Sequence, residues 1–401
     1  MKLNKQNKRG ISLIVLVITI IVMIILAAAI ILSLNSSGII GKAKEATTKS
    51  DEANLKEAAS IKLAEYELAK QLGELANPNQ TAAQYVKEKL QGEMDVSGLA
   101  ITSEGEILTG LTEIAVKFVE AGVEIGAEVT GYVLDNSEDA KTYPTSGNEN
   151  TCDPDTYEET DPQKATLTRD NAITWRYFGI DEKGEATIVG SITSASPKMT
   201  LGGKGGYLNG PQELKDACEA MYSGTMGTGR SITIEDVTRV LEYTGERGSY
   251  YSAKSYDYTP TKEPLTIGEI ISKYGEPALT STEIPEEGKN INTYKANYYY
   301  INKTDDASEY NTAMQNLIYP GSTTDLTTYY WLASPCVNAY FDDDYASFSV
   351  RFVDSLDVRA TCMFDSYGSS GYDTYAVRPV VSLSSDIQMT YSNGVVALSA
   401  N

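Results

Sequence analysis

The chain of 401 residues is 41% hydrophobic and 9% aromatic, enough to bury the cores of two or three domains, which excludes general disorder. Its 33 basic and 55 acidic residues give a net charge of -22 that repels nucleic-acid phosphates, so no nucleic acid is expected as a partner. Histidine is absent, which removes the commonest general base and zinc ligand, whereas 28 tyrosines against 6 phenylalanines favour a contact surface.

The N-terminus is a short basic segment followed by an apolar one. Residues 1–10 carry four basic side chains and no acid, and residues 11–34 carry no charge. This run exceeds the roughly 20 residues that a helix needs to cross a bilayer, and the basic flank predicts a cytoplasmic N-terminus. The sequence therefore predicts a leader over 1–10, a transmembrane helix over 11–34, and a single-pass cell-membrane protein with an extracellular C-terminal domain. An ordinary signal anchor is the alternative.

The junction K-R-G followed by I-S-L-I-V-L-V resembles the type IV prepilin signal, in which a basic leader ends in glycine and cleavage precedes the apolar helix. The resemblance implies cleavage between Gly10 and Ile11, with a prepilin peptidase and other pilins as partners and a pilus as a second location. Val15 departs from the pattern, because pilins of the filament core usually carry glutamate at this fifth mature position. A minor pilin, or an anchor that never polymerises, therefore remains open.

Strong helix formers continue the chain beyond the apolar segment. Gly38 and Gly41 interrupt the run, and Pro78 lies in the Asn-Pro-Asn sequence that ends the helix formers. This pattern predicts an extended pilin-like helix over 35–77. Its apolar residues recur at a spacing mostly near three, so we expect one face to pack on the domain that follows.

A small pilin-like β region is expected over 78–133. A short helical stretch near 82–90 comes first, and apolar and small residues alternate over 116–133 as they do in short strands. Residues 134–170 are rich in Asp, Glu, Asn, Ser, Thr and Pro and contain few apolar residues. This composition predicts an acidic linker that separates two domains.

Local signals mark three elements early in the C-terminal part of the chain. Two β-rich runs on either side of residues 181–184 predict a hairpin. Pro211 marks the start of one helix, and a variant capping box that begins at Thr233 marks the start of a second. Glycine clusters at 201–206 and 224–231 lack the spacing of a phosphate-binding loop and are interpreted as ordinary loops.

The stretch from Tyr330 to Leu383 contains two kinds of position. Apolar residues that look like fixed anchors alternate irregularly with Tyr, Asp, Ser, Thr and Arg, as if a β scaffold carried arbitrary surface residues. Lys, Glu and Gln are absent from the stretch. Randomising both adenines of the Asn codon AAC gives an N-N-C codon, and such a codon cannot encode any of these three residues. The anchors are Trp331, Leu332, Val350, Val353, Val358, Val377, Pro379 and Val380.

The motifs Y-W-L-A-S and V-R-P-V-V-S-L at the two ends of this stretch resemble the C-type-lectin-like variable proteins diversified by diversity-generating retroelements, and Trp331 and Arg378 match that pattern. The resemblance implies a C-type-lectin-like mixed α/β domain over 171–401, with a variable-looking region over 336–377 that binds a protein or glycan ligand. Ordinary loops that were never diversified are the alternative. The implied contacts are Tyr340, Phe341, Asp342, Asp343, Asp344, Tyr345, Ser347, Arg351, Asp354, Asp357, Arg359, Tyr367, Tyr372, Asp373 and Tyr375.

The sequence as a whole predicts an α+β protein with a transmembrane and pilin helix, a small β region and a C-terminal lectin-like domain. We expect a membrane-anchored or pilus-associated surface protein that displays this domain for adhesion or recognition, without cofactor, metal or catalytic residues. A structural minor pilin without a ligand is one alternative. Another is an oxidase, because formylglycine-generating enzymes share the lectin-like fold and use a cysteine pair, for which Cys336 and Cys362 are the candidates. These two cysteines could instead form a disulfide.

Overall fold

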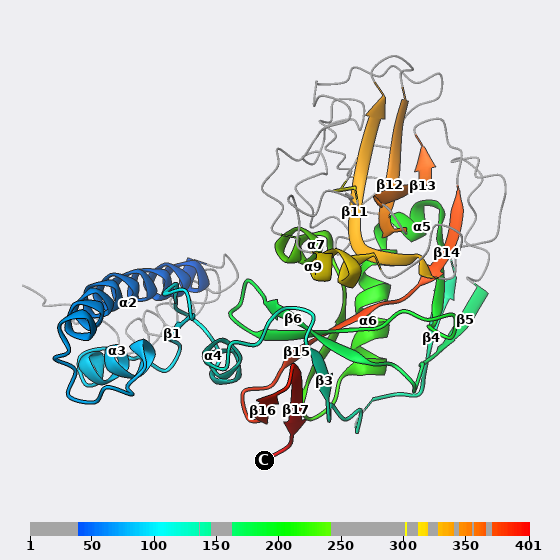
Figure 1. Ribbon diagram of the computed structural model, residues 1–401. Coiled ribbons are helices and arrows are strands. Elements are labelled where there is room, and N and C mark those ends of the chain that lie inside the picture. The colour runs from blue at the N-terminus through cyan, green and yellow to red at the C-terminus, as the bar shows by residue number, and fades with distance from the viewer. Residues whose placement is uncertain are drawn as a thin grey trace, which may run out of the picture. The chain divides into compact units, whose positions relative to one another are not determined.

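The computed structural model describes residues 39–135, 137–145, 163–241, 301–302, 312–319, 328–340, 345–354, 357–365 and 371–401 (Figure 1). The chain divides into two compact units, and each is described by itself. The first unit is Met1–Val96 with Ile107–Thr109, and the second is Ser97–Glu106 with Gly110–Asn401. The fold is mixed α/β, with many strands and few helices in the described part.

In its described part, from residue 39 on, the first unit contains two helices and one short strand. They are α2 (Ile39–Leu72), α3 (Ala82–Leu90) and β2 (Ile107–Leu108). Helix α3 coincides with the predicted helical stretch, and a reciprocal capping box between Thr81 and Gln84 begins it. Helices α2 and α3 pack together, and the hydroxyl of Tyr66 on α2 donates to the Gln80 carbonyl at 2.9 Å.

The predicted membrane-spanning helix is corrected by the structure. No helix among residues 39–401 that the structure describes is long and apolar enough to cross a bilayer. Helix α2 has the length, at 34 residues, but charged side chains recur along it from Lys42 to Lys70. The expected transmembrane helix, on which the single-pass cell-membrane or pilus location depended, is thus not found in the part of the chain that the structure describes. The helix predicted over 35–77 is present as α2, but α2 is not a membrane span. The predicted leader over 1–10, the Gly10–Ile11 junction and the predicted span over 11–34 lie outside the described residues.

The second unit contains two large sheets. The seven-stranded sheet has the order β16-β17-β3-β6-β7-β15-β9. Its strands are β3 (Glu128–Thr130), β6 (Trp175–Ile180), β7 (Ala186–Gly190), β9 (Gly227–Ser231), β15 (Pro379–Leu383), β16 (Gln388–Ser392) and β17 (Val395–Ser399). The parallel pairing of β17 with β3 joins the last strand of the chain to the first part of this unit.

The six-stranded sheet has the order β10-β13-β12-β11-β14-β8. Its strands are β8 (Lys198–Gly202), β10 (Ile301–Asn302), β11 (Tyr330–Tyr340), β12 (Tyr345–Val353), β13 (Asp357–Asp365) and β14 (Tyr372–Ala376). Figure 1 shows β11 and β12 extending beyond the helices that pack at their base. The bases of these strands are therefore in the core, while their far ends project from it.

The remaining elements of the second unit fill the space around the sheets. They are the short strand β1 (Ala100–Ile101), the hairpin of β4 (Ala140–Thr145) and β5 (Gln163–Thr168), and the helices α4 (Glu113–Glu120), α5 (Gly203–Leu208), α6 (Gly210–Tyr222), α7 (Ile234–Val240) and α9 (Thr312–Ile318). Helix α6 packs against β9 and β15 of one sheet and β11 of the other. It therefore lies between the sheets, where the larger hydrophobic cluster forms.

Several local predictions are confirmed. The hairpin β6–β7 turns at residues 181–184, where Gly184 adopts a φ of +76°. Helix α6 carries Pro211 in its first turn, and α7 follows the capping box of Thr233 and Asp236.

Other expectations differ from the structure. The glycine cluster at 201–206 forms the end of β8 and most of α5, and the second cluster contains β9, because tertiary packing overrides their loop composition. Strand β3, expected in a separate β region, pairs with β6 and β17 of the second unit. Part of the predicted acidic linker forms β4 and β5, and Tyr143 and Leu167 of this hairpin are buried.

Replacing Gly184 by alanine is expected to destabilise the second unit. A Cβ atom at Gly184 would clash with the backbone oxygen of Gly110, whereas at Gly394, with a similar φ of +77°, it meets nothing within 4 Å. We expect losses in the free energy of unfolding of about 3 kcal/mol for Gly184→Ala and about 1 kcal/mol for Gly394→Ala. Guanidinium denaturation followed by tryptophan fluorescence measures both, since Trp175 and Trp331 belong to this unit. Equal losses in the free energy of unfolding for the two variants would contradict the close approach of Gly184 to the backbone of Gly110.

Candidate ligand-binding surface

The apolar anchors of the stretch from 330 to 383 are all part of the core. Trp331, Leu332, Val350, Val353, Val358 and Val380 are 0% exposed, Val377 is 1% exposed, and Pro379 is buried. They lie on β11, β12, β13 and β15 and in the connection between β14 and β15. The apolar residues of this stretch are thus buried, as expected of a β scaffold, while their constancy in sequence stays a prediction.

An aromatic cluster of Tyr329, Trp331, Phe352 and Tyr375 joins three strands of the six-stranded sheet. The ring of Tyr375 on β14 stacks on Phe352 of β12 at 4.5 Å and lies 4.6 Å from Trp331 of β11. Trp331 is fixed in turn, because its indole Nε1 donates to the carbonyl of Met199 at 2.8 Å. Burial raises the pKa of Tyr375 to about 12, so this phenol is neutral at ordinary pH.

The other end of β14 presents side chains to solvent. Tyr372 is 45% exposed, Asp373 is half-buried and Thr374 is exposed. Gly202 of β8 lies opposite Tyr372, and a Cβ atom there would come within 2.5 Å of the Tyr372 Cβ, so the glycine makes room for the tyrosine. The hydroxyls of Thr374 and Thr200 hydrogen-bond across the same strands at 2.8 Å. The Tyr375 end of β14 is thus packed into the aromatic cluster, whereas the side chain of Tyr372 at the other end is exposed to solvent.

Two of the predicted contact residues have buried side chains. Arg351 is 2% exposed, and its NH1 donates to the Pro335 carbonyl at 3.1 Å. Asp354 is 7% exposed and accepts a hydrogen bond at 2.9 Å from Nε of Arg359, whose side chain is 45% exposed. Arg351 and Asp354 therefore stabilise the β11–β12–β13 strands, while Arg359 is accessible to a ligand.

The backbone brings another group of predicted contacts to the free end of the β11–β12 hairpin. Tyr340 pairs with Tyr345, and Ser347 pairs with Asn338. Asp357, in contrast, begins β13 at the opposite end of these strands, where it pairs with Asn302 of β10. Phe341, Asp342, Asp343, Asp344 and Tyr367 lie outside the described residues.

The strand order places the two candidate cysteines on strands that are not neighbours. Cys336 of β11 and Cys362 of β13 both pair with Ser349 of the intervening strand β12. Two strand spacings separate their Cα atoms by about 10 Å. A disulfide requires less than about 7 Å, so this backbone does not allow the pairing.

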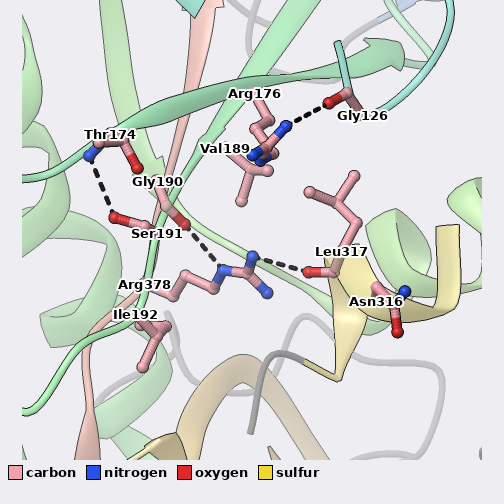
Figure 2. Close-up of a pocket in the computed structure, with 10 residues that line it drawn as sticks. All are labelled: Gly126, Thr174, Arg176, Val189, Gly190, Ser191, Ile192, Asn316, Leu317 and Arg378. Carbon is pink, nitrogen blue, oxygen red and sulfur yellow. Dashed lines mark hydrogen bonds between the residues drawn. The ribbon is translucent and has the colours of Figure 1, made fainter. Parts of the chain in front are cut away.

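A pocket of 370 Å³ lies away from these strands, beside the seven-stranded sheet (Figure 2). Its lining includes Arg378, which is 2% exposed, and the exposed Arg176 of β6. In the sequence, Arg378 stands out only as a charged residue within the apolar V-R-P-V-V motif, and the pocket itself was not predicted.

Comparison of the chain with protein-family models, with curated proteins and with solved structures found no match. The resemblances described from the sequence therefore remain predictions.

Substituting the two tyrosines of β14 tests the division between its fixed and open ends. We expect Tyr375→Ala to lower the free energy of unfolding by about 3 kcal/mol, because it leaves a cavity against Phe352 and Trp331. Tyr372→Ala is expected to change it by less than about 0.5 kcal/mol. Chemical denaturation followed by tryptophan fluorescence provides the comparison. A large loss for Tyr372→Ala would show that this residue belongs to the core.

Proposed function

We propose that the second unit is a recognition domain that binds a protein or glycan ligand through the outer parts of β11–β14. The observation that carries this proposal is the separation of two residue sets within one stretch of chain. All eight apolar anchors are buried, while Tyr372 and Arg359, which stand between them in sequence, are exposed. Such a surface accepts substitution without loss of the core beneath it.

The chemistry of the exposed set suits binding. Tyr372 supplies a large amphipathic ring with only two rotatable angles, so its immobilisation by a ligand costs little entropy. Asp373 and Thr374 follow this tyrosine on the same strand, and the exposed Arg359 of β13 adds a positive charge to the set. The fixed aromatic cluster behind β14 holds these groups in place before a ligand arrives, which lowers the cost of binding.

The resemblance to the C-type-lectin-like variable proteins of diversity-generating retroelements supports the same proposal. In that interpretation the surface residues of the stretch vary between individuals, and the ligand changes with them. On this proposal, burial separates the positions expected to stay constant from those expected to vary. Buried Arg351 and Asp354 belong with the constant scaffold, whereas Tyr372, Asp373 and Arg359 belong with the variable surface.

An oxidase of the formylglycine-generating type is a weaker candidate. It would need the thiols of Cys336 and Cys362 together, and strand β12 lies between these positions. The chain also lacks histidine, the commonest general base.

Array binding with matched variants tests the recognition proposal. The fluorescently labelled chain is applied to a glycan array and a protein array, and the strongest ligand is then titrated. We expect the double variant Tyr372→Ala/Asp373→Ala to weaken binding at least about tenfold, as loss of a central tyrosine contact does.

The control is Thr390→Ala/Asp386→Ala, which removes one exposed side chain of β16 and one exposed carboxylate near it. This variant is expected to bind as the parent does. The proposal is contradicted if neither array shows saturable binding, or if both double variants bind equally.

A further inference from the structure

The described lining of the pocket in Figure 2 comes from five separate segments of the sequence. Thr174 and Arg176 come from β6 and the residue before it, Val189 to Ile192 from the end of β7, and Asn316 and Leu317 from α9. Gly126 and Arg378 complete the described lining, and none of these described residues has an acidic side chain. In a chain with 55 acidic residues, a pocket lined by two arginines and no carboxylate is unusual.

Arg378 is a buried cation whose partners within the described structure are all neutral. Its Nε donates to the Gly190 carbonyl at 3.0 Å and NH2 to the Leu317 carbonyl at 2.7 Å, while NH1 lies 3.5 Å from the Ile318 carbonyl. The guanidinium also lies 4.7 Å from the ring centre of Tyr330. Three of its five N–H groups are thereby used, and among the described residues no carboxylate forms an ion pair with it. A buried charge without a counter-ion is costly, so an anion beside Arg378 gains a strong electrostatic interaction.

Arg176 supplies a second cation on the open side of the pocket. Its NH1 donates to the Gly126 carbonyl at 2.9 Å, as Figure 2 shows, which leaves its other N–H groups available within the described structure. Glu128 lies opposite Arg176 in the β3–β6 register, but the two form no ion pair. Arg176 is therefore positioned by a backbone carbonyl and keeps its charge for a ligand.

The rest of the lining indicates the kind of anion. Hydroxyls of Thr174 and Ser191 and the amide of Asn316 add neutral hydrogen-bonding groups, and Val189, Ile192 and Leu317 provide apolar wall. A bare inorganic ion would leave this wall unused. A cavity of 370 Å³ accommodates an organic molecule about the size of one sugar residue, with an acid group for the arginines.

We propose that this pocket binds a small organic carboxylate, of the size and polarity of an acidic monosaccharide, between Arg176 and Arg378. The carboxylate accepts hydrogen bonds from both guanidinium groups, and the carbon body contacts Val189, Ile192 and Leu317. The site is separate from the Tyr372 surface and does not depend on it.

Calorimetric titration of the full chain with D-glucuronate tests the proposal, and D-glucose serves as the uncharged ligand of the same ring size. We expect saturable binding of glucuronate, no binding of glucose at about 10 mM, and weaker glucuronate binding as salt is raised. Arg176→Gln is expected to weaken binding at least about tenfold, since it removes a charge-assisted hydrogen bond. Arg176 is exposed, so the variant keeps its fold, which tryptophan fluorescence verifies.

The matched control is Lys183→Gln, which removes an exposed positive charge from the turn of the same β6–β7 hairpin without touching the pocket. It is expected to bind glucuronate as the parent does. Arg378→Lys keeps the buried charge but loses the planar fork, and is expected to weaken binding as well. The proposal is overturned if glucuronate does not bind at about 10 mM, if Arg176→Gln and Lys183→Gln bind equally, or if inorganic phosphate competes as well as glucuronate.

Discussion

Alternate side chains of strand β11 point to opposite faces of the sheet and pack into two different hydrophobic clusters. The rest of the second unit depends on this constraint. Tyr330 and Leu332 belong to the cluster around α7 and α9, while Trp331 and Ala333 belong to the cluster around α6. A slip of one residue would exchange every side chain between the two clusters, so the register is strongly specified. The hydrogen bond from Trp331 to Met199 adds a fixed point between β11 and β8.

That fixed register is what gives the exposed residues a defined position. Strand β14 lies between β11 and β8, and Tyr375 rests on Trp331 and Phe352. Tyr372, three residues earlier, is therefore held in place although it is exposed. A surface of this kind combines rigidity of the backbone with freedom in the choice of side chain, and this combination is the physical basis for proposing recognition as the function.

Sequence reasoning succeeded where the signal was local. The β6–β7 turn, the start of α6 at Pro211 and the capping box of α7 each depend on a few adjacent residues. It failed where distant segments decide the outcome. The pairing of β3 with β17, the helix formed by the glycine cluster in α5, and the pocket between β6, β7 and α9 leave no local pattern. The burial of Arg351 and Asp354 was missed for the same reason, because neighbouring strands, not sequence neighbours, cover these polar side chains.

Sequencing the segment that encodes residues 330–383 across a population of the source organism tests the account most directly. We expect substitutions to concentrate at surface positions such as Tyr372 and Asp373, while Trp331 and Val353 stay constant and buried Arg351 and Asp354 stay constant with them. An invariant segment, or substitutions spread equally over buried and exposed positions, would contradict a recognition surface built on a fixed scaffold.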